Sequence, residues 1–224
     1  NGGLEWAVVQ PRSVAAFQNL PEVDVRLFAP NVGEGVRALA PETVKLRMTA
    51  GRAAILKLLS IYREMMYPLS QIEVQKLTYF LVDAGQDLGT LQFQTHTYGP
   101  YAPTLRHVLT KMDGAYLTGV GDGEHPSEIR VVGSALAEAV EFLAAQDDRD
   151  TANRVERIAR LIDGFETPYG MELLATVHWV VTQEGAKTVD DTVARTYAWH
   201  AQKKKFTVRQ IGIAHEVLTR QGWL

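Results

Sequence analysis

Apolar side chains follow a helical period over most of the chain. From residue 50 onward they recur at spacings of three and four, which is typical of amphipathic helices. The pattern predicts helices over about 50–66, from Ser70 onward, through "APTLRHVLTKM", from Ser134 to about Ala145, and over about 151–164, 168–182, 189–200 and 208–220. Helix starts are marked by the capping boxes Ser70-x-x-Glu73 and Thr207-x-x-Gln210 and by Thr167-Pro168.

Three short segments between these helices have strand character. "TLQFQTH" alternates between apolar and polar residues. "YLTGVG" and "EIRVV" are joined through "DGEHPS" and read as an antiparallel hairpin. The predicted fold class is therefore α+β, a mainly helical domain with a small antiparallel sheet.

The first 47 residues follow a different pattern. A short helix from about Arg12 to Asn19 and a strand "VDVRLFAP" are predicted there. One helix and one strand cannot bury both of their faces, so we expect them to be the end of another domain in a longer protein. The predicted organisation is a domain remnant at 1–30, a linker at 31–47 and the main domain at 48–224.

Composition narrows the class of protein. Apolar residues make up 46% and charged residues 22% of the 224, as in folded globular proteins, and there is no cysteine. No apolar run approaches the roughly 20 residues of a membrane span, so we expect a cytoplasmic protein without a membrane partner.

Short catalytic motifs do not occur in the sequence. It lacks His-Glu-x-x-His, Gly-x-Ser-x-Gly and the phosphate-loop pattern, and its six histidines are scattered. Gly119, Gly121 and Gly123 precede a strand rather than a helix and favour a hairpin tip. We therefore expect no catalytic residue, no metal ligand and no cofactor in this chain.

Charge is unevenly distributed around a net value of −3. Between Glu138 and Glu172 the sequence contains nine acidic residues and four arginines. Between Arg195 and Arg209 it contains five basic residues and no acidic residue. "WHAQKKKFT" in this basic part fits either a solvated corner between helices or a nucleic-acid patch. The order of elements over 50–132 also resembles a winged helix in outline, with Arg106, His107 and Lys111 on the candidate recognition helix.

Three long blocks carry a resemblance to a known family. They are "MTAGRAAILKLL…EVQKLTYFLVDAG…YGPYAPTLRHVLTKMDGAYLTGVGD", "RLIDGFETPYGMELLATVHWV" and "AWHAQKKKFTVRQIGIAHEVLTRQGWL". Together they resemble the C-terminal domain of DarG antitoxins, of the DNA ADP-ribosyl glycohydrolase family, from about Met48 to Leu224. Lys76-Leu77-x-Tyr79-Phe80 and Tyr98-Gly99-Pro100 more distantly resemble the SocA/Panacea antitoxin-like domain.

The resemblance implies a function. "GGLEW" and the following Pro-Glu-Val-Asp-Val strand resemble the end of the macrodomain that removes ADP-ribose from DNA in that family. Most of the macrodomain pocket is missing, so we expect this chain not to be an enzyme. Its expected function is to bind and inhibit a DarT-type toxin, which attaches ADP-ribose to single-stranded DNA, and we expect no direct nucleic-acid partner. The alternative is a winged-helix-like, autoregulatory DNA-binding domain.

Acidic mimicry of single-stranded DNA is our hypothesis for inhibition. Carboxylates along a helix can occupy the basic groove of a DNA-binding toxin, and aromatic rings can imitate stacked bases. A solvated acidic face is the competing interpretation. The candidate partner-binding residues are Tyr98, Tyr101, Glu156, Asp163, Glu166, Tyr169 and Trp179. For Tyr98 and Tyr101, packing beneath the hairpin is the other possibility.

Overall fold

The computed structural model describes residues 10–12, 15, 46–63, 69–121 and 128–224. The chain divides into two compact units, Asn1–Thr43 and Val44–Leu224. In the first unit, residues 10–12 and 15 are helical. The rest of the predicted helix, the predicted strand and nearly all of the predicted linker lie outside the described residues.

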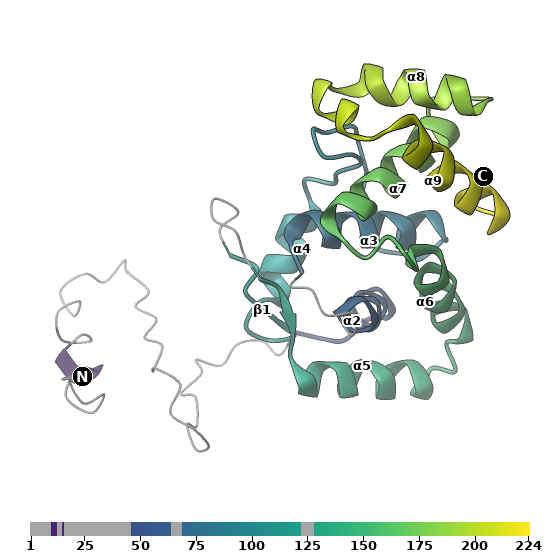
Figure 1. Ribbon diagram of the computed structural model, residues 1–224. Helices are drawn as coiled ribbons and strands as arrows, with labels where there is room; N and C mark the ends of the chain where they lie inside the picture. Colours follow the sequence, from purple (N-terminus) through teal and green to yellow (C-terminus); the bar gives the residue numbers. More distant parts are fainter. Residues whose placement is uncertain (1–9, 13–14, 16–45, 64–68, 122–127) are drawn as a thin grey trace. The chain divides into compact units, whose positions relative to one another are not determined.

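Helix α2 (Ala50–Arg63) is the centre of the Val44–Leu224 unit. It contacts α3 (Gln71–Asp83), α5 (Gly133–Ala145) and α6 (Arg149–Ile162), which surround it in Figure 1. Its apolar stripe is buried because helices pack on several sides of it. The buried residues of α2 are Ala53, Ala54, Ile55, Leu56, Leu58, Leu59 and Tyr62.

Helix α7 (Pro168–Thr182) forms a second layer on α3. Its other side packs against α8 (Val189–Trp199) and α9 (Val208–Arg220), which are linked by the short 3₁₀-helix η1 (Ala201–Lys205) (Figure 1). A helix enclosed on both sides is apolar over most of its surface. The buried polar residues of α7, Glu172, Thr176 and His178, are exceptions that need partners.

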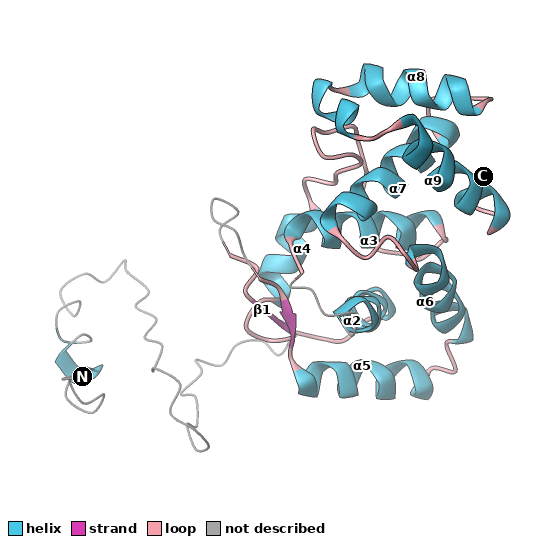
Figure 2. Ribbon diagram, viewed as in Figure 1, coloured by secondary structure: helices cyan, strands magenta, loops and turns pink. Residues whose placement is uncertain are grey.

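The small sheet follows α4 (Leu105–Met112). Strands β1 (Leu117–Thr118) and β2 (Arg130–Val131) pair antiparallel, with Leu117 opposite Val131 (Figure 2). The predicted hairpin and the α+β class are therefore confirmed, although residues 122–127 at the hairpin tip lie outside the described residues. The strand predicted for "TLQFQTH" is wrong, because only Gln94 pairs, with Tyr101 across the following turn.

Helix caps follow the sequence at most positions. The capping boxes at Ser70 and Thr207 are both formed, and Thr167 caps α7. Ser134 is not a cap, because α5 begins one residue earlier, at Gly133, and Val132, which joins β2 to α5, takes the N-cap position. Among the described residues, no helix is both long enough and apolar enough to span a bilayer.

Candidate functional site: a lysine–glutamate cluster beneath the Tyr98–Gly99–Pro100 turn

The Tyr98–Gly99–Pro100 turn approaches α3 and α7 closely. Gly99 has a φ of 91°, in the left-handed region that favours glycine. A Cβ at this position would lie 2.9 Å from Thr176 Oγ1 and 3.4 Å from Lys76 Cε. Glycine is thus required both by the backbone conformation and by the close approach of the turn to the two helices.

Lys76 of α3 fixes this turn from below. Its side chain is buried, and its Nζ donates a hydrogen bond to Pro100 O at 2.7 Å. Burial and, after it, repulsion from Lys203 lower the pKa of Lys76 to about 7, against the opposing attraction to Glu172. Near neutral pH the amine is therefore partly uncharged, which suits its single neutral acceptor.

Glu172 of α7 lies between two lysines of η1. Its Oε1 is 2.8 Å from Lys203 Nζ, and its Oε2 is 2.8 Å from Lys205 Nζ. Lys203 is completely buried and also donates to Thr176 Oγ1 at 3.2 Å. Burial lowers the pKa of Lys203, while the contact with Glu172 raises it. The carboxylate joins η1 to α7 and keeps the buried ammonium paired.

Lys205 forms the exposed end of this lysine–glutamate cluster. Its Nζ lies 5.2 Å from the ring of Phe206, 5.7 Å from Tyr169 and 5.9 Å from Tyr98. The hydroxyl of Tyr169 is within hydrogen-bond distance of Lys205 O and of Gln210 Oε1. An ammonium among aromatic rings, with Tyr98 39% exposed, offers a surface suited to contact with another molecule.

The four aromatic candidates do not all meet at this cluster. Tyr98 and Tyr169 border Lys205, whereas the half-buried Tyr101 stacks on His96 with ring centroids 4.8 Å apart. Trp179 is also half-buried and lies near the rings of Tyr79 and Trp199.

The three acidic candidates lie away from the cluster, on α6 and the segment after it. Glu156 is exposed on α6, and Asp163 is exposed at the C-terminal end of that helix. Their spacing of seven residues places them on roughly the same helix face, about 10 Å apart. Glu166 is half-buried, and its charge contributes to raising the pKa of Tyr62, after burial and Glu73.

Arginines interrupt the acidic surface of α6. Arg154 donates to Ala84 O at 3.2 Å. Arg157 donates to Gly222 O at 2.8 Å, and its guanidinium lies 4.1 Å from the ring centroid of Trp223. Both arginines thus donate to backbone carbonyls. The exposed carboxylates beside them therefore remain available to another molecule.

A second polar cluster crosses the α3–α7 interface. Tyr79 Oη is 2.7 Å from His178 Nδ1, and His178 Nε2 lies 3.4 Å from Asp83 Oδ2. Burial raises the pKa of Tyr79. His178 thus has different partners from Glu172, in agreement with their spacing of six residues along α7.

Lys76, Glu172 and Lys203, at the centre of the lysine–glutamate cluster, were not among the candidate residues predicted from the sequence. "WHAQKKKFT" fits neither of its two interpretations completely, because Lys203 is buried and Lys205 binds Glu172. Of the three lysines, only Lys204 is exposed and without a side-chain partner among the described residues. One signal was present in the sequence. Glu172 is a charged residue in the densest apolar helix of the chain, and a buried carboxylate requires a partner.

A metal site requires several ligating side chains close together. Within residues 10–12, 15, 46–63, 69–121 and 128–224, no three histidine, aspartate or glutamate side chains are grouped so that they could hold a metal ion.

The sequence of the chain is similar to those of several known proteins. No protein-family model matches the chain. The chain is 42% identical over 224 residues to a protein of Thermus aquaticus named DNA ADP-ribosyl glycohydrolase, which covers 100% of the chain and 61% of that relative. Proteins of the same name from Mycobacterium tuberculosis and Mycobacterium bovis are 40% identical over 235 residues, covering 96% of the chain and 64% of each relative. The chain thus spans about three-fifths of the length of these relatives.

The expectation that this chain is not an enzyme is contradicted by these relatives. Proteins named as glycohydrolases match 96–100% of the chain, and the Thermus aquaticus match runs through all 224 residues. The names of these relatives are those of hydrolases. Our expectation relied on the lack of short catalytic motifs and on the macrodomain pocket, most of which the resemblance implies is missing. An active site assembled from residues far apart in the sequence need not contain a short motif.

Proposed function

We propose that this chain is part of a hydrolase that removes ADP-ribose from DNA, and that its Val44–Leu224 unit also binds and inhibits a DarT-type DNA ADP-ribosyltransferase. The observation that supports the first part most strongly is the 42% identity over the whole chain to a protein named DNA ADP-ribosyl glycohydrolase. The second part rests on the resemblance of the Met48–Leu224 blocks to DarG antitoxins.

Two surfaces of the unit are proposed to contact the toxin. Glu156 and Asp163 are exposed on one face of α6 and can enter a groove that binds DNA phosphates. Tyr98 and Tyr169 flank the Lys205 ammonium and can stack against a planar group. Acidic mimicry of single-stranded DNA is thus the proposed inhibitory mechanism.

Inhibition is tested by titrating the chain into a DarT-type toxin with NAD and a labelled single-stranded oligonucleotide. We expect the initial rate of DNA modification to fall linearly and to reach its minimum near a fixed molar ratio, because a tight complex removes toxin stoichiometrically. An unchanged initial rate, with no complex in size-exclusion chromatography, would refute toxin binding.

Hydrolysis is tested separately with purified, ADP-ribosylated oligonucleotide and no toxin. Release of ADP-ribose by the chain supports the hydrolase proposal, and the lack of any release contradicts it for this chain. Because the first experiment measures the initial rate of modification and the second measures its reversal, either half of the proposal can fail alone.

Charge reversal tests the mimicry mechanism. Replacing Glu156, Asp163 and Glu166 by Lys reverses the charge of the acidic surface on α6 and the segment after it, and we expect toxin affinity at moderate salt to fall at least about tenfold. The matched control reverses three exposed carboxylates elsewhere, Glu141, Glu184 and Glu216, with the same change in net charge. Equal affinity of the two triple variants would reject mimicry by α6.

Binding of duplex DNA is the second candidate function. Arg106, His107 and Lys111 are all exposed on α4, which precedes the β1–β2 hairpin as a recognition helix precedes a wing. An electrophoretic shift of duplex DNA at physiological salt, lost when Arg106 and Lys111 are replaced by Ala, would favour this candidate over toxin binding.

A further inference from the structure

A groove of about 790 Å³ follows the exposed face of α9, beside the start of α8. Val189 forms its α8 side, and all its other lining residues belong to α9. Three large apolar side chains at this place are exposed: Val189 by 40%, Ile213 by 44%, and Val208, one residue before the lining residue Arg209, by 56%. Exposed apolar side chains gathered in one place are typical of a contact with another protein.

The α9 side of the groove contains one continuous row of the helix surface. Its members are separated by four, three and four residues, a spacing that keeps them on one face of the helix over about 16 Å. They are Arg209, Ile213, Glu216 and Arg220, all of them exposed. The three charged members form no ion pair with any described residue. Their charges are therefore available to another molecule.

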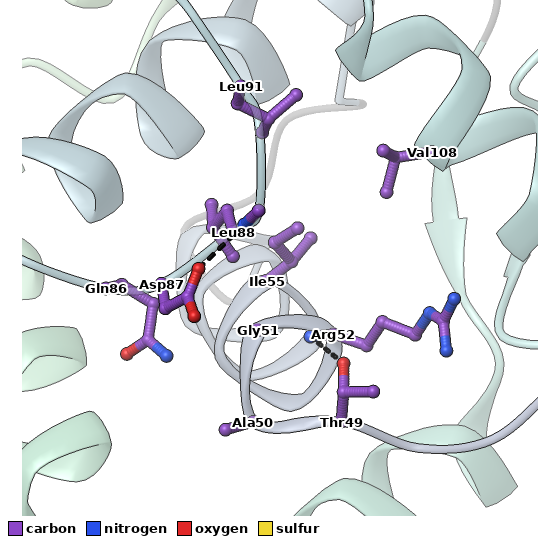
Figure 3. Close-up of a pocket in the computed structure, with 11 residues that line it drawn as sticks. Thr49, Ala50, Gly51, Arg52, Ile55, Gln86, Asp87, Leu88, Leu91 and Val108 are labelled. Atoms are coloured by element: carbon purple, nitrogen blue, oxygen red, sulfur yellow. Dashed lines mark hydrogen bonds between the residues drawn. The ribbon is translucent and has the colours of Figure 1, made fainter.

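Gly212 leaves a gap in this face that the unit itself does not need. It lies inside α9, where glycine is less favourable than alanine. A Cβ at this position would meet Val189 Cγ1 at 4.0 Å, which is an ordinary contact distance. Gly51 on α2 is different, because a Cβ there would lie 2.7 Å from Leu88 Cδ2 and packing requires glycine (Figure 3). Nothing in the described part of the unit requires glycine at position 212, so the gap can receive a side chain from another molecule.

The face of α9 is complementary to itself when two copies lie antiparallel. A two-fold axis that passes between Gly212 and Ile213 places these two residues opposite each other in the pair. Ile213 of each copy then fills the gap at Gly212 of the other, beside Val189, as a knob enters a hole. Arg209 and Glu216 lie three residues to either side, so the same axis places each of them opposite the other and forms two identical ion pairs.

We propose that the exposed face of α9 binds a second copy of this chain through an antiparallel pair of α9 helices. A second copy satisfies both charges at once, whereas a uniformly acidic or uniformly basic partner would place a like charge against Glu216 or Arg209. The proposal is independent of the toxin-binding and hydrolase functions.

The interface is only one helix wide on each copy. Such a contact belongs to the small class that buries less than about 1,200 Å² in total, so the association is weak and reversible. The chain is therefore monomeric at the much lower concentrations of a toxin titration. For this reason the reversal of Glu216 in the control variant for toxin binding does not act through self-association.

Sedimentation velocity of the 224-residue chain, from low micromolar to submillimolar concentration, tests for self-association. We expect a reversible equilibrium between monomer and dimer without larger species, because a two-fold contact is complete once two copies have joined. A chain that stays monomeric over the whole range would overturn the proposal. Open-ended growth into larger assemblies would also overturn it.

Charge reversal tests the antiparallel register. In Arg209→Glu or Glu216→Arg alone, both ion pairs become contacts between like charges, so we expect the dissociation constant of the dimer to rise at least about tenfold. Combining the two changes in one chain exchanges the charges and should restore the dimer. Mixing the two single variants should give a heterodimer, because the two acidic residues of one copy then face the two basic residues of the other. Parental self-association of either single variant, or no association in the mixture, would overturn the proposed register.

Gly212→Gln tests the gap in the face of α9. Glutamine is a good helix former, so the midpoint of thermal unfolding should not fall, while the new side chain occupies the place of Ile213 of the second copy. We expect the dissociation constant of the dimer to rise at least about tenfold. The matched control is Gly133→Gln at the start of α5, an exposed glycine whose Cβ would meet no other described part of the chain within 4 Å. Equal self-association of the two glycine variants would contradict the role of Gly212.

Discussion

Glu73 and Glu172 are both buried carboxylates on helices of the same unit, but they are stabilised by opposite means. Glu73 is 0% and Glu172 is 3% exposed. Burial of an ionised carboxylate is unfavourable unless hydrogen bonds or charges compensate it. One of these residues is compensated by neutral donors and the other by two ammonium groups.

Glu73 is held by dipoles, mostly from its own helix start. Tyr62 Oη donates to its Oε1 at 2.6 Å, and Ser70 N and Oγ both donate to its Oε2 at 2.8 Å. No formal positive charge takes part in these contacts. The arrangement raises the pKa of Tyr62, through burial first and then through Glu73.

Glu172 is held by charges from a distant segment. Lys203 and Lys205 are 31 and 33 residues further along the chain. Removal of Glu172 would leave the ammonium of Lys203 buried without a counter-charge, whereas removal of Glu73 would leave only neutral donors. The comparison shows that equal burial does not mean equal energetic consequence.

The largest effect is expected from Glu172→Gln. The substitution keeps the shape of the side chain but removes the charge that compensates Lys203, and breaking a buried ion pair in this way costs about 3–5 kcal/mol. Urea denaturation should therefore show a large loss in the free energy of unfolding.

A double variant provides the control for this prediction. In Glu172→Leu combined with Lys203→Met, both buried charges are replaced by apolar groups, and most of the lost stability should return. A loss below about 1 kcal/mol in Glu172→Gln would show that the ion pair is not needed to keep Lys203 buried.

The contrast between the two carboxylates also explains what the sequence could predict. Ser70 and Glu73 are three residues apart, so their capping box is visible in the sequence and occurs in the structure. The same holds for Thr207 with Gln210 and for the helices themselves, because their hydrogen bonds and apolar stripes are local. Ser134 failed as a cap because a strand meets α5 there, which is a tertiary effect.

The lysine–glutamate cluster could not be predicted in the same way. Its members come from α3, the Tyr98–Gly99–Pro100 turn, α7 and η1, and sequence spacing carries no information about contacts between such distant segments. Three consecutive lysines are typical of a solvated surface, and only the fold distinguishes Lys203 from Lys204. Tyr98 and Tyr169 were named as candidates, but their position beside Lys205 was not foreseen.

An intermediate effect is expected from the pH dependence of Lys76. Its folded-state pKa is about 7, below the value of 10.5 for an unburied lysine. Between these values the unfolded chain binds a proton that the folded chain does not, so the free energy of unfolding should rise with pH, by up to about 1.4 kcal/mol per pH unit from this residue. Below pH 7 both states are protonated, and Lys76 adds no slope.

Lys76→Met tests the origin of this slope. The variant removes the buried amine, so its stability should change less between about pH 6.5 and about 9.5 than that of the parent chain. Lys204→Met, at an exposed lysine, should retain the parental slope. The raised pKa values of Tyr62 and Tyr79 act only above this range, since an ordinary tyrosine titrates near 10. Parallel curves for the parent chain and Lys76→Met would show that Lys76 is charged throughout.

The smallest effect is expected from Glu73→Gln, the same substitution at the other buried carboxylate. Glutamine is also suitable at the third position of a capping box, and it retains one oxygen that can accept from Ser70 or from Tyr62. We expect a loss of about 1–2 kcal/mol in the free energy of unfolding. A double-mutant cycle with Tyr62→Phe isolates the contact between the two side chains. An equal loss of stability in Glu73→Gln and Glu172→Gln would contradict this prediction. It would mean that removing the carboxylate charge costs as much beside neutral donors as beside ammonium groups.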